Sequence, residues 1–337
     1  MTSGQSTPRR SMDPVTRALA GWQPARVLMT ASRLDVFSVL GDRHLPAGEI
    51  ARGCGTHPRS TKLLLNACVA LGYLLKDGDR YGNSPEAREL LVKGQPAYLG
   101  DAIGHAEHLY LAWGQLTEAV RTNRRVAPPP AVSDVPRVHR DFILAMHTRA
   151  LRTGEALAET LDLTGRKQLF DAGGGPGTYS IFLVRRHPGL RAIVFDLAPT
   201  IEIAREVIAG AGLSDRIGLR TGDYFRDDFG QGNDVVLLSA VLHSMGPRRC
   251  RLLLTKAYDS LVSGGIVAVH EGLIDPDGTS PVWAALFSLN MLVNTGEGRS
   301  YSGHEIAGWM REAGFVEPAV KPVPPPANTA VVIGTKP

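Results

Sequence analysis

Apolar positions in the first hundred residues recur at helical spacing and are followed by two short extended segments. One helical stripe consists of Leu63, Leu64, Ala67, Ala70 and Leu71. Pro58 near its start and Gly72 just past its end are typical of helix boundaries. Residues 73–76 and 80–81 then predict two strands joined by a turn at Asp77-Gly78. Short helices followed by such a hairpin predict a winged-helix arrangement.

The rest of the chain changes from helices to alternating strands and helices. Residues 99–163 have a mainly helical pattern, with a proline-rich connector at 127–130. The predicted strands are 168–170, 192–195, 217–220, 235–238, 266–269 and 330–334, the last of them at an edge of the sheet. The predicted helices between them are 179–186, 200–209, 248–261 and 304–313. This alternation predicts a parallel sheet with helices on both faces.

Composition narrows the class of protein. The 337 residues are 43% hydrophobic and 21% charged, which is typical of a globular protein and excludes disorder, a collagen-like repeat and a disulfide scaffold. The net charge of +4 is small and scattered, so we expect neither nucleic acid nor a membrane as a partner. Residues 1–14 contain no apolar leader and are expected to form an N-terminal tail, and no apolar stretch approaches the ~20 residues that span a bilayer. We therefore expect a soluble, cytoplasmic protein.

Metal and DNA sites receive little support from the sequence. Cys54, Cys68 and Cys250 are far apart, and no Cys/His cluster has metal-ligand spacing, so we expect free thiols and no metal. A winged helix often binds DNA through a recognition helix. Here the helix in that position, which begins near Pro58, has only Arg59 and Lys62 as basic residues, both in its first turn. Because the rest of that helix is apolar nearly all round, we expect it to be packed on both sides. A protein–protein role is favoured, and a ligand-sensing DNA-binding regulator is the alternative.

A glycine-rich turn, DAGGGPG, follows the first predicted strand of the second half and precedes a helix. Glycines let the backbone approach a ligand closely, and the helix N-terminus offers free N–H groups. Gly173, Gly175 and Gly177 are two residues apart, unlike the G-x-G-x-x-G spacing of a dinucleotide site, and no GK[ST] follows as in a phosphate-binding P-loop. The turn predicts a nucleotide-type ligand, and its spacing disfavours the alternative of an NAD-dependent oxidoreductase.

Acidic residues follow successive predicted strands. Besides Asp171 in the glycine-rich turn, Asp196 ends the second strand, where a carboxylate can accept both hydroxyls of a ribose. Asp223 follows the third strand and can accept a hydrogen bond from an exocyclic amine such as that of adenine. Ligands of open α/β sheets bind at the carboxyl ends of the strands, so these acids predict one shared site.

Several segments together resemble a known family. They are DAGGGPGTYS, VFDL, GDYF, LLSAVLH and LVSGG ahead of IVAVHEGL. These segments closely resemble the S-adenosylmethionine-dependent methyltransferases of the plant-type small-molecule O-methyltransferase family, whose bacterial members modify antibiotics and other secondary metabolites. The resemblance includes the N-terminal winged helix and the ending AGFVEP…VVIGTKP, so it covers nearly the whole chain. It is specific for fold and cofactor and weak for the methyl acceptor.

The resemblance implies a domain organisation. A Rossmann-like class I methyltransferase domain with a mostly parallel seven-stranded sheet would occupy residues 164–337. A winged-helix-like dimerisation domain would occupy 12–98, and a helical connector that lines the acceptor pocket would occupy 99–163. The protein would be a homodimer with S-adenosyl-L-methionine as its cofactor.

The resemblance also implies which residues bind that cofactor. Gly173, Gly175 and Gly177 would lie against its methionine and ribose portions. Asp196 would hold the ribose hydroxyls, and Leu197 would flank the adenine. The other implied cofactor contacts are Asp171, Gly222, Asp223, Tyr224, Phe225 and Ser239, of which the last would present a backbone group.

The implied catalytic residue is His243, which matches the family histidine that deprotonates the acceptor hydroxyl. This chain departs from the family's LHDW at that point, because Ser244 and Met245 replace the acid and the tryptophan. Glu271 or Glu297 would therefore hold the histidine, and Glu271, which follows the fifth strand and aligns with another acid of the family, is favoured. The departure keeps open a C- or N-methyltransferase, or a member that uses the cofactor without transferring a methyl group.

The implied acceptor is an aromatic or polyketide-like small molecule. Its pocket would be lined by residues of the helical connector and of the segment 283–294, where Trp283, Phe287, Asn290 and Met291 recur with helical spacing. Such a stripe is equally typical of a buried core. The implied pocket residues are Trp113, Phe142, Met146, Phe287, Asn290 and Met291.

Overall fold

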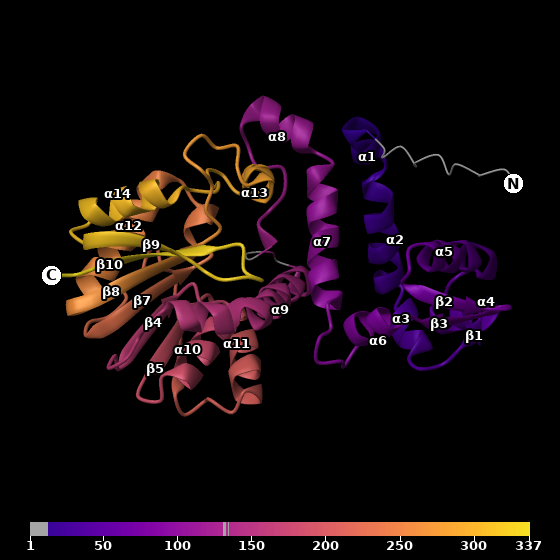
Figure 1. Ribbon diagram of the computed structural model, residues 1–337, viewed down its shortest axis with the longest axis horizontal. Helices are drawn as coiled ribbons and strands as arrows, with labels where there is room; N and C mark the ends of the chain where they lie inside the picture. Colours follow the sequence, from indigo (N-terminus) through magenta and orange to yellow (C-terminus); the bar gives the residue numbers. More distant parts are fainter. Residues whose placement is uncertain (1–12, 131–132, 134) are drawn as a thin grey trace, which may run out of the picture. The chain divides into compact units, whose positions relative to one another are not determined.

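The computed structural model describes residues 13–130, 133 and 135–337, in two compact units that divide after Glu107 (Figure 1). The predicted N-terminal tail therefore lies outside the described residues up to residue 12, as does the first residue of the predicted dimerisation domain. Among the described residues, no helix is long and apolar enough to cross a membrane. No group of three or more His, Cys, Asp or Glu in the same residues could hold a metal ion.

The first unit contains short helices around a three-stranded antiparallel sheet with the order β1-β3-β2. Its helices are α1 (Pro14–Ala20), α2 (Trp22–Arg33), α3 (Val36–Leu40), α4 (Ala47–Gly53), α5 (Pro58–Ala70) and α6 (Pro85–Leu91). Its strands are β1 (Leu45–Pro46), β2 (Leu74–Asp77) and β3 (Arg80–Asn83). The predicted helix, hairpin and winged-helix arrangement are thus confirmed, and Pro58 is the first residue of α5.

Helix α5 buries one face in the core of this unit. Leu65 and Cys68 have no exposed surface and pack with Ile50, Leu74 and Tyr81. Burying an apolar side chain of this size stabilises a fold by about 1.5–3 kcal/mol. On the opposite side of α5, 59% of Leu63 is exposed. The expectation that α5 is packed on both sides is therefore not met within the described chain, because its second face lacks a covering element.

Three helices follow before the large sheet. They are α7 (Gly100–Trp113), α8 (Leu116–Thr122) and α9 (Pro136–Thr160). The division between the two units falls within α7. The proline-rich connector is attached to the second unit, because the backbone N–H groups of Val126 and Ala127 donate to the carbonyl of Val293 over 3.0 and 3.2 Å.

The second unit is built on a seven-stranded sheet with the order β6-β5-β4-β7-β8-β10-β9. The strands are β4 (Gln168–Ala172), β5 (Arg191–Asp196), β6 (Ile217–Thr221), β7 (Asn233–Ser239), β8 (Leu261–Glu271), β9 (Val316–Pro322) and β10 (Ala330–Thr335). Strands β4 to β8 pair with one another in parallel, and β10 is antiparallel to both β8 and β9. The mostly parallel seven-stranded sheet is confirmed.

One strand prediction is wrong. Residues 330–334 were expected at an edge, but β10 lies between β8 and β9. Strand β9 takes the edge, and the sequence pattern missed it because its side chains are mostly exposed and it contains Pro318 and Pro322. Prolines are tolerated at an edge, where one side of the strand has no neighbour to receive an N–H. Ala330, Val331 and Val332 are buried, as an interior strand requires.

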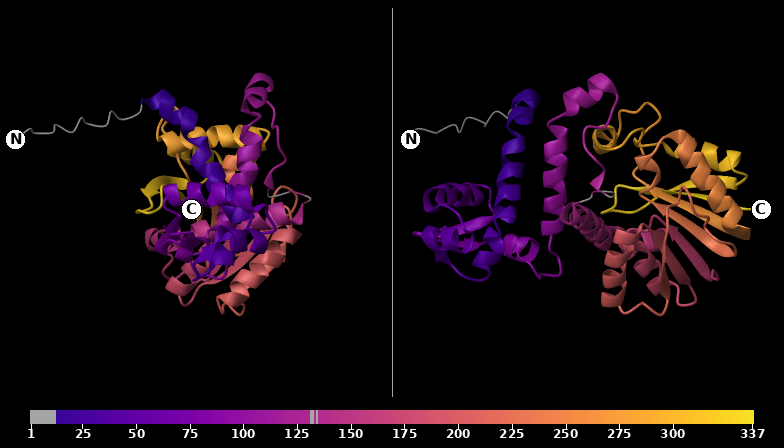
Figure 2. Two further views of the ribbon diagram at one scale, coloured as in Figure 1. Left: turned by 90° about the vertical axis from the view of Figure 1, so that its right-hand side faces the viewer. Right: turned by 180° about the vertical axis from the view of Figure 1, so that it is seen from behind.

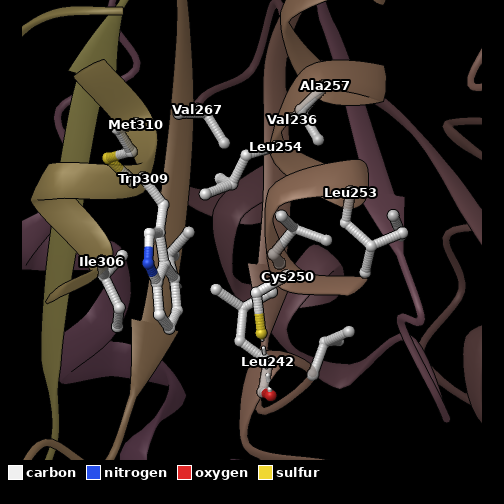
Figure 3. Packing of buried hydrophobic residues seen from close by; sticks show 14 of the residues in the cluster. Val236, Leu242, Cys250, Leu253, Leu254, Ala257, Val267, Ile306, Trp309 and Met310 are labelled. Carbon is white, nitrogen blue, oxygen red and sulfur yellow. Dashed lines mark hydrogen bonds between the residues drawn. The ribbon is translucent and has the colours of Figure 1, made fainter. Parts of the chain in front are cut away.

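Helices cover both faces of this sheet, because successive residues of a buried strand point to opposite sides. Helices α10 (Thr178–Arg186) and α11 (Ala198–Gly210) lie on one face, and α12 (Pro247–Ser260) and α14 (Gly303–Glu312) lie on the other (Figures 1 and 2). On β7, Val235 and Leu237 pack on the face covered by α10 and α11, and Val236 and Leu238 pack on the face covered by α12 and α14. Figure 3 shows the hydrophobic core on this second face, in which Trp309 of α14 lies opposite residues of α12.

Candidate active site

The glycine-rich turn leaves an open space beside its middle glycine. Gly173, Gly175 and Gly177 all have positive φ angles, of 72°, 56° and 73°, which other residues rarely adopt. The N–H of Gly173 donates to the carbonyl of Phe195 over 2.8 Å and fixes the turn against β5. A Cβ on Gly177 would lie 2.9 Å from Ile208 Cδ1, whereas a Cβ on Gly175 would meet no atom within 4 Å. The space at Gly175 is therefore free for a ligand.

Asp171 presents a buried polar atom that lacks a partner. Its side chain is in the interior, and Oδ2 accepts a hydrogen bond from Ser180 Oγ over 2.7 Å. Oδ1 is buried and has no hydrogen bond from any described residue. Burial raises the pKa of Asp171 to about 7, against the opposing hydrogen bond from Ser180 and with a smaller upward effect of Asp196. An unsatisfied buried oxygen is costly, so this atom indicates a place where a donor binds.

Asp196 joins the glycine-rich turn to the start of α11. Its Oδ2 accepts from the N–H of Gly175 over 2.9 Å, and its Oδ1 accepts from the N–H of Leu197 over 2.7 Å. Burial raises the pKa of Asp196, and these two backbone hydrogen bonds act in the opposite direction. A carboxylate has about four acceptor positions, so Asp196 can still accept from a ligand's hydroxyl groups.

The segment after β6 is hydrogen-bonded to the end of β5, beside Asp196. The N–H of Gly222 donates to the carbonyl of Asp196 over 3.0 Å. The carboxylate of Asp223 is used locally, because Oδ1 accepts from the N–H of Phe225 over 2.9 Å and Oδ2 lies 3.5 Å from Arg226 Nε. The ring of Tyr224 packs against Phe225, and burial raises the pKa of its hydroxyl to about 12. Asp223 can bind adenine only through its remaining acceptor positions.

A buried polar chain that the sequence analysis missed lies behind Ser239. Ser239 Oγ is 2.8 Å from His270 Nδ1, and His270 Nε2 is 2.8 Å from Thr329 Oγ1. Burial lowers the pKa of His270 to about 4, so the ring is neutral. The side chain of Ser239 therefore points into the core. A histidine inside the apolar run IVAVHE was the available signal.

The backbone is strained immediately after Ser239. Ala240 has a φ of 55°, which is unusual for a residue with a Cβ, and its N–H donates to the carbonyl of His270 over 2.9 Å. Such positions cost about 1–3 kcal/mol and gather at functional sites. The strained residue therefore lies at the carboxyl end of β7, at the same edge of the sheet as the glycine-rich turn.

His243 and Glu271 form a hydrogen-bonded pair at this edge of the sheet. His243 lies on the short 3-10 helix that follows β7, and Glu271 is the last residue of β8. Nδ1 of His243 is 2.8 Å from Oε2 of Glu271, and the N–H of His243 donates to Oε1 over 3.3 Å. Burial by itself raises the pKa of Glu271, but attraction to His243 and these hydrogen bonds outweigh it and the pKa is lowered. The ionised carboxylate thus keeps a proton on Nδ1, and Nε2 of His243 is left to accept one.

The second candidate glutamate does not contact this histidine. Glu297 is exposed and lies against Gly246, and it makes no hydrogen bond or ion pair within the part of the chain that the structure describes. Ser244, which stands where the family has an acid, donates from Oγ to the carbonyl of Val241 over 2.8 Å. Of the residues proposed to hold His243, the structure brings Glu271 to it and leaves Glu297 apart.

The implied acceptor residues are partly assembled around helix α13 (Val282–Asn294). The ring of Phe287 packs edge-to-face on His243, with ring centres 4.9 Å apart. Trp113 Nε1 donates to Asn290 Oδ1 over 2.9 Å. Met291 is 7% exposed and belongs to the interior. Phe142 and Met146 are half-buried residues of α9, and their place in the pocket stays a prediction.

Comparison with known proteins identifies a methyltransferase domain and a dimerisation domain. Residues 113–316 match the model of the O-methyltransferase domain, and residues 19–93 match that of the O-methyltransferase dimerisation domain. The chain is 36% identical to 3-hydroxy-5-methyl-1-naphthoate 3-O-methyltransferase of Streptomyces sahachiroi, over 99% of both chains. It is 35% identical to the tetracenomycin polyketide synthesis 8-O-methyl transferase of Streptomyces glaucescens, over 93% of both chains.

A solved relative contains the expected cofactor. The structure of human N-acetylserotonin methyltransferase in complex with S-adenosylmethionine is 26% identical to this chain and has a TM-score of 0.85, with 100% of this chain and 99% of that chain covered. The open side of Gly175 and the unpartnered oxygen of Asp171 are features that a bound cofactor would fill and satisfy. The chain belongs to the family of S-adenosylmethionine-dependent O-methyltransferases that carry an N-terminal dimerisation domain.

Proposed function

We propose that this enzyme methylates a hydroxyl group of an aromatic or polyketide-like small molecule, with His243 as the general base. The observation that supports this most directly is the His243–Glu271 pair, held at the carboxyl edge of the sheet next to the glycine-rich turn. The two Streptomyces relatives, one named for a naphthoate and one for tetracenomycin polyketide synthesis, support an aromatic acceptor of secondary metabolism.

We propose that cofactor binding uses the edge formed by β4, β5 and β6. The carboxylate of Asp196 accepts from ribose hydroxyls, and the open side of Gly175 admits the cofactor next to the backbone. The other proposed contacts are Asp171, Gly173, Gly177, Leu197, Gly222, Asp223, Tyr224, Phe225 and Ser239. S-adenosylmethionine supplies an electrophilic methyl group on its sulfonium sulfur.

The chain's own residues then align and activate the acceptor. Nε2 of His243 would take the hydroxyl proton as the acceptor oxygen bonds to the methyl carbon and the carbon–sulfur bond breaks, and the positive ring that results would be stabilised by Glu271. Phe287, packed against the imidazole, provides an apolar wall that keeps water from the reacting oxygen. Alignment of two bound reactants is worth up to about 7–11 kcal/mol, and a base contributes about 10²–10⁴-fold in rate.

The test is incubation of the purified enzyme with S-adenosylmethionine and a panel of naphthols, hydroxynaphthoates and anthraquinone phenols, read by mass spectrometry. We expect a mass gain of one methyl group and a fragmentation pattern that places it on oxygen. A methyl group found on carbon or nitrogen instead would reject O-methylation. Turnover of acceptors without any hydroxyl would reject it equally.

We also propose that the protein is a homodimer. Residues 12–98 would form the dimerisation domain, 99–163 the connector that lines the acceptor pocket, and 164–337 the catalytic domain. The match of residues 19–93 to a dimerisation domain supports this, as do the exposed Leu63 of α5 and the exposed Val15, Leu19 and Trp22 near the start of the described chain. Exposed apolar groups of this kind are typical of protein–protein contacts.

A further inference from the structure

The side-chain amide of Asn290 is held in one orientation by two hydrogen-bond donors. Trp113 Nε1 donates to Asn290 Oδ1 over 2.9 Å, and Asn294 Nδ2 donates to the same oxygen over 3.2 Å. An indole N–H can only donate, so the atom that faces it must be the oxygen of the amide. Asn294 is fixed in turn, because its Nδ2 also donates to the backbone carbonyl of Asn290 over 2.9 Å.

This arrangement leaves Asn290 with a donor and no acceptor for a ligand. Its Oδ1 receives two hydrogen bonds, which uses both lone pairs of a carbonyl oxygen. Its Nδ2 makes no hydrogen bond to any described residue, and this atom is not among the fully buried ones. The free group on this side chain is therefore an accessible NH₂, which can only donate.

The position of Asn290 relates this donor to the proposed base. Asn290 and Phe287 are three residues apart on α13, so they are neighbours on one helix face. Phe287 contacts the ring of His243, and Asn290 is about 4.5 Å further along the helix axis. A flat acceptor that rests on Phe287 with its hydroxyl at His243 would thus bring a more distant ring substituent to Asn290.

We propose that Asn290 is a specificity-determining residue that selects acceptors with a hydrogen-bond-accepting oxygen on the ring system. A carbonyl, quinone oxygen or carboxylate satisfies the NH₂ of Asn290. An ammonium group at that place sets donor against donor, which leaves a polar group without a partner and weakens binding. This inference rests on the proposed function and adds to it the chemical class of a second substituent on the acceptor.

The test compares acceptors that differ only in this substituent. Wild-type enzyme and Asn290→Asp are assayed with a hydroxynaphthoate and with the naphthol that lacks its carboxylate, and kcat/KM is measured for each. We expect the wild type to prefer the hydroxynaphthoate by at least about tenfold. Asn290→Asp replaces the NH₂ by a carboxylate oxygen while Trp113 can still donate, so the preference should fall about 10–100-fold and the naphthol should be affected less.

Two further variants separate this role from a structural one. Trp113→Phe keeps the aromatic ring and removes the N–H, so the amide can turn over and the preference should weaken without a loss of cofactor binding. Asn328→Asp makes the same chemical change at an exposed loop position and should leave the preference unchanged. Equal losses on both acceptors in Asn290→Asp would overturn the proposal.

A second readout decides the inference without methyl transfer. The affinities of 1-naphthoate and of 1-methylnaphthalene, of which only the first has a hydrogen-bond-accepting oxygen and neither has a ring hydroxyl, are measured by calorimetry in the presence of S-adenosylhomocysteine. The wild type should bind 1-naphthoate more tightly, and Asn290→Asp should lose that difference. If binding shows this pattern but no hydroxyl of the panel is methylated, the proposed function fails and the role of Asn290 stands. If methylation occurs and neither readout changes in Asn290→Asp, the role of Asn290 fails and the proposed function stands.

Discussion

The ends of β4 and β8 each carry a carboxylate, and the two differ in ionisation although both are almost fully buried. Asp171 is 1% exposed and Glu271 is 5% exposed. Asp171 has the hydroxyl of Ser180 as its polar partner, and its pKa is raised to about 7 by burial. Glu271 receives hydrogen bonds from the ring and the backbone of His243, and its pKa is lowered despite the same burial.

The difference shows that the partner, rather than burial, sets the charge of a carboxylate at this edge. Desolvation penalises both ions, and at Glu271 the attraction to His243 and the hydrogen bonds from its ring and backbone outweigh that penalty. The β4 end therefore holds an acid whose unpartnered oxygen suits a bound ligand. The β8 end holds an ion that is already paired and can orient a base. The two ends are thus suited to the cofactor and the acceptor, respectively.

The largest effect is expected from removing the imidazole of His243, the hydrogen-bond partner of Glu271. His243→Ala should lower kcat by about 10²–10⁴-fold and leave cofactor affinity nearly unchanged, because a general base is lost. It should also leave Glu271 as an unpaired buried carboxylate like Asp171, so that its pKa rises. Steady-state kinetics, calorimetry with S-adenosylhomocysteine and carboxyl NMR measure these quantities. His304→Ala, at an exposed histidine, is the control; near-full turnover of His243→Ala would mean that alignment alone drives the transfer.

The next largest effect is expected from removing the negative charge of Glu271. Glu271→Gln keeps the shape but removes the charge that holds the proton on Nδ1 of His243, so we expect kcat to fall about 10–100-fold. Glu297→Gln is the matched comparison and should stay within about twofold of the wild type, because Glu297 makes no contact with His243. Measurement of kcat over a range of pH for both variants decides which glutamate holds His243. A larger loss in Glu297→Gln would reverse the assignment.

The cofactor side should respond in affinity instead of rate. Asp196→Ala removes the acceptor proposed for the ribose hydroxyls, which should weaken cofactor binding by about 1.5–3 kcal/mol. Calorimetry with S-adenosylhomocysteine measures this loss, with Glu202→Ala at an exposed position of α11 as the control. Unchanged affinity in Asp196→Ala would refute the role of this residue.

A smaller effect concerns stability and pH at the β4 end. The pKa of Asp171 is about 7 in the folded chain against a reference of 3.8, so the folded state binds the extra proton between these values. Its contribution to the free energy of unfolding is therefore full below about pH 4 and is lost as pH rises through about 7. The size of this pKa shift limits the contribution of Asp171 to the free energy of unfolding to about 4 kcal/mol. Rearrangement of the protein around the ionised carboxylate should reduce the contribution to about 1–2 kcal/mol.

Asp171→Asn removes this titration and tests it in the ligand-free protein. The variant should gain stability relative to the wild type on going from pH 5 to pH 8, as measured by urea unfolding. Asp215→Asn, at an exposed acid, should show no such gain. Parallel pH curves for wild type and Asp171→Asn would show that Asp171 is ionised without penalty.

The proposed dimer can be tested without any ligand. Light scattering of the full chain at micromolar concentration should give twice the mass of one chain, and a chain that begins at Leu99 should be monomeric or aggregate. The expected reason is the loss of the apolar surfaces of the first unit. A stable monomer of the full chain would contradict the proposal.

The sequence by itself determined those features that depend on neighbouring residues. The pattern of apolar positions predicted every strand of the large sheet except β9, and spacing predicted the glycine-rich turn with acids at the ends of β4 and β5. Such features are local, because side-chain period and glycine φ angles act within a few residues. The resemblance of short motifs then pointed to the cofactor and to His243.

Only the tertiary structure decided which distant residues meet. It placed β10 inside the sheet, set Glu271 rather than Glu297 on His243, 28 residues away in sequence, and joined Trp113 to Asn290 across 177 residues. It also paired Ser239 with His270 behind the cofactor edge. These contacts follow from the order of strands and the packing of helices, and no spacing within a segment encodes them, because strand order depends on pairings between segments that are far apart in the chain.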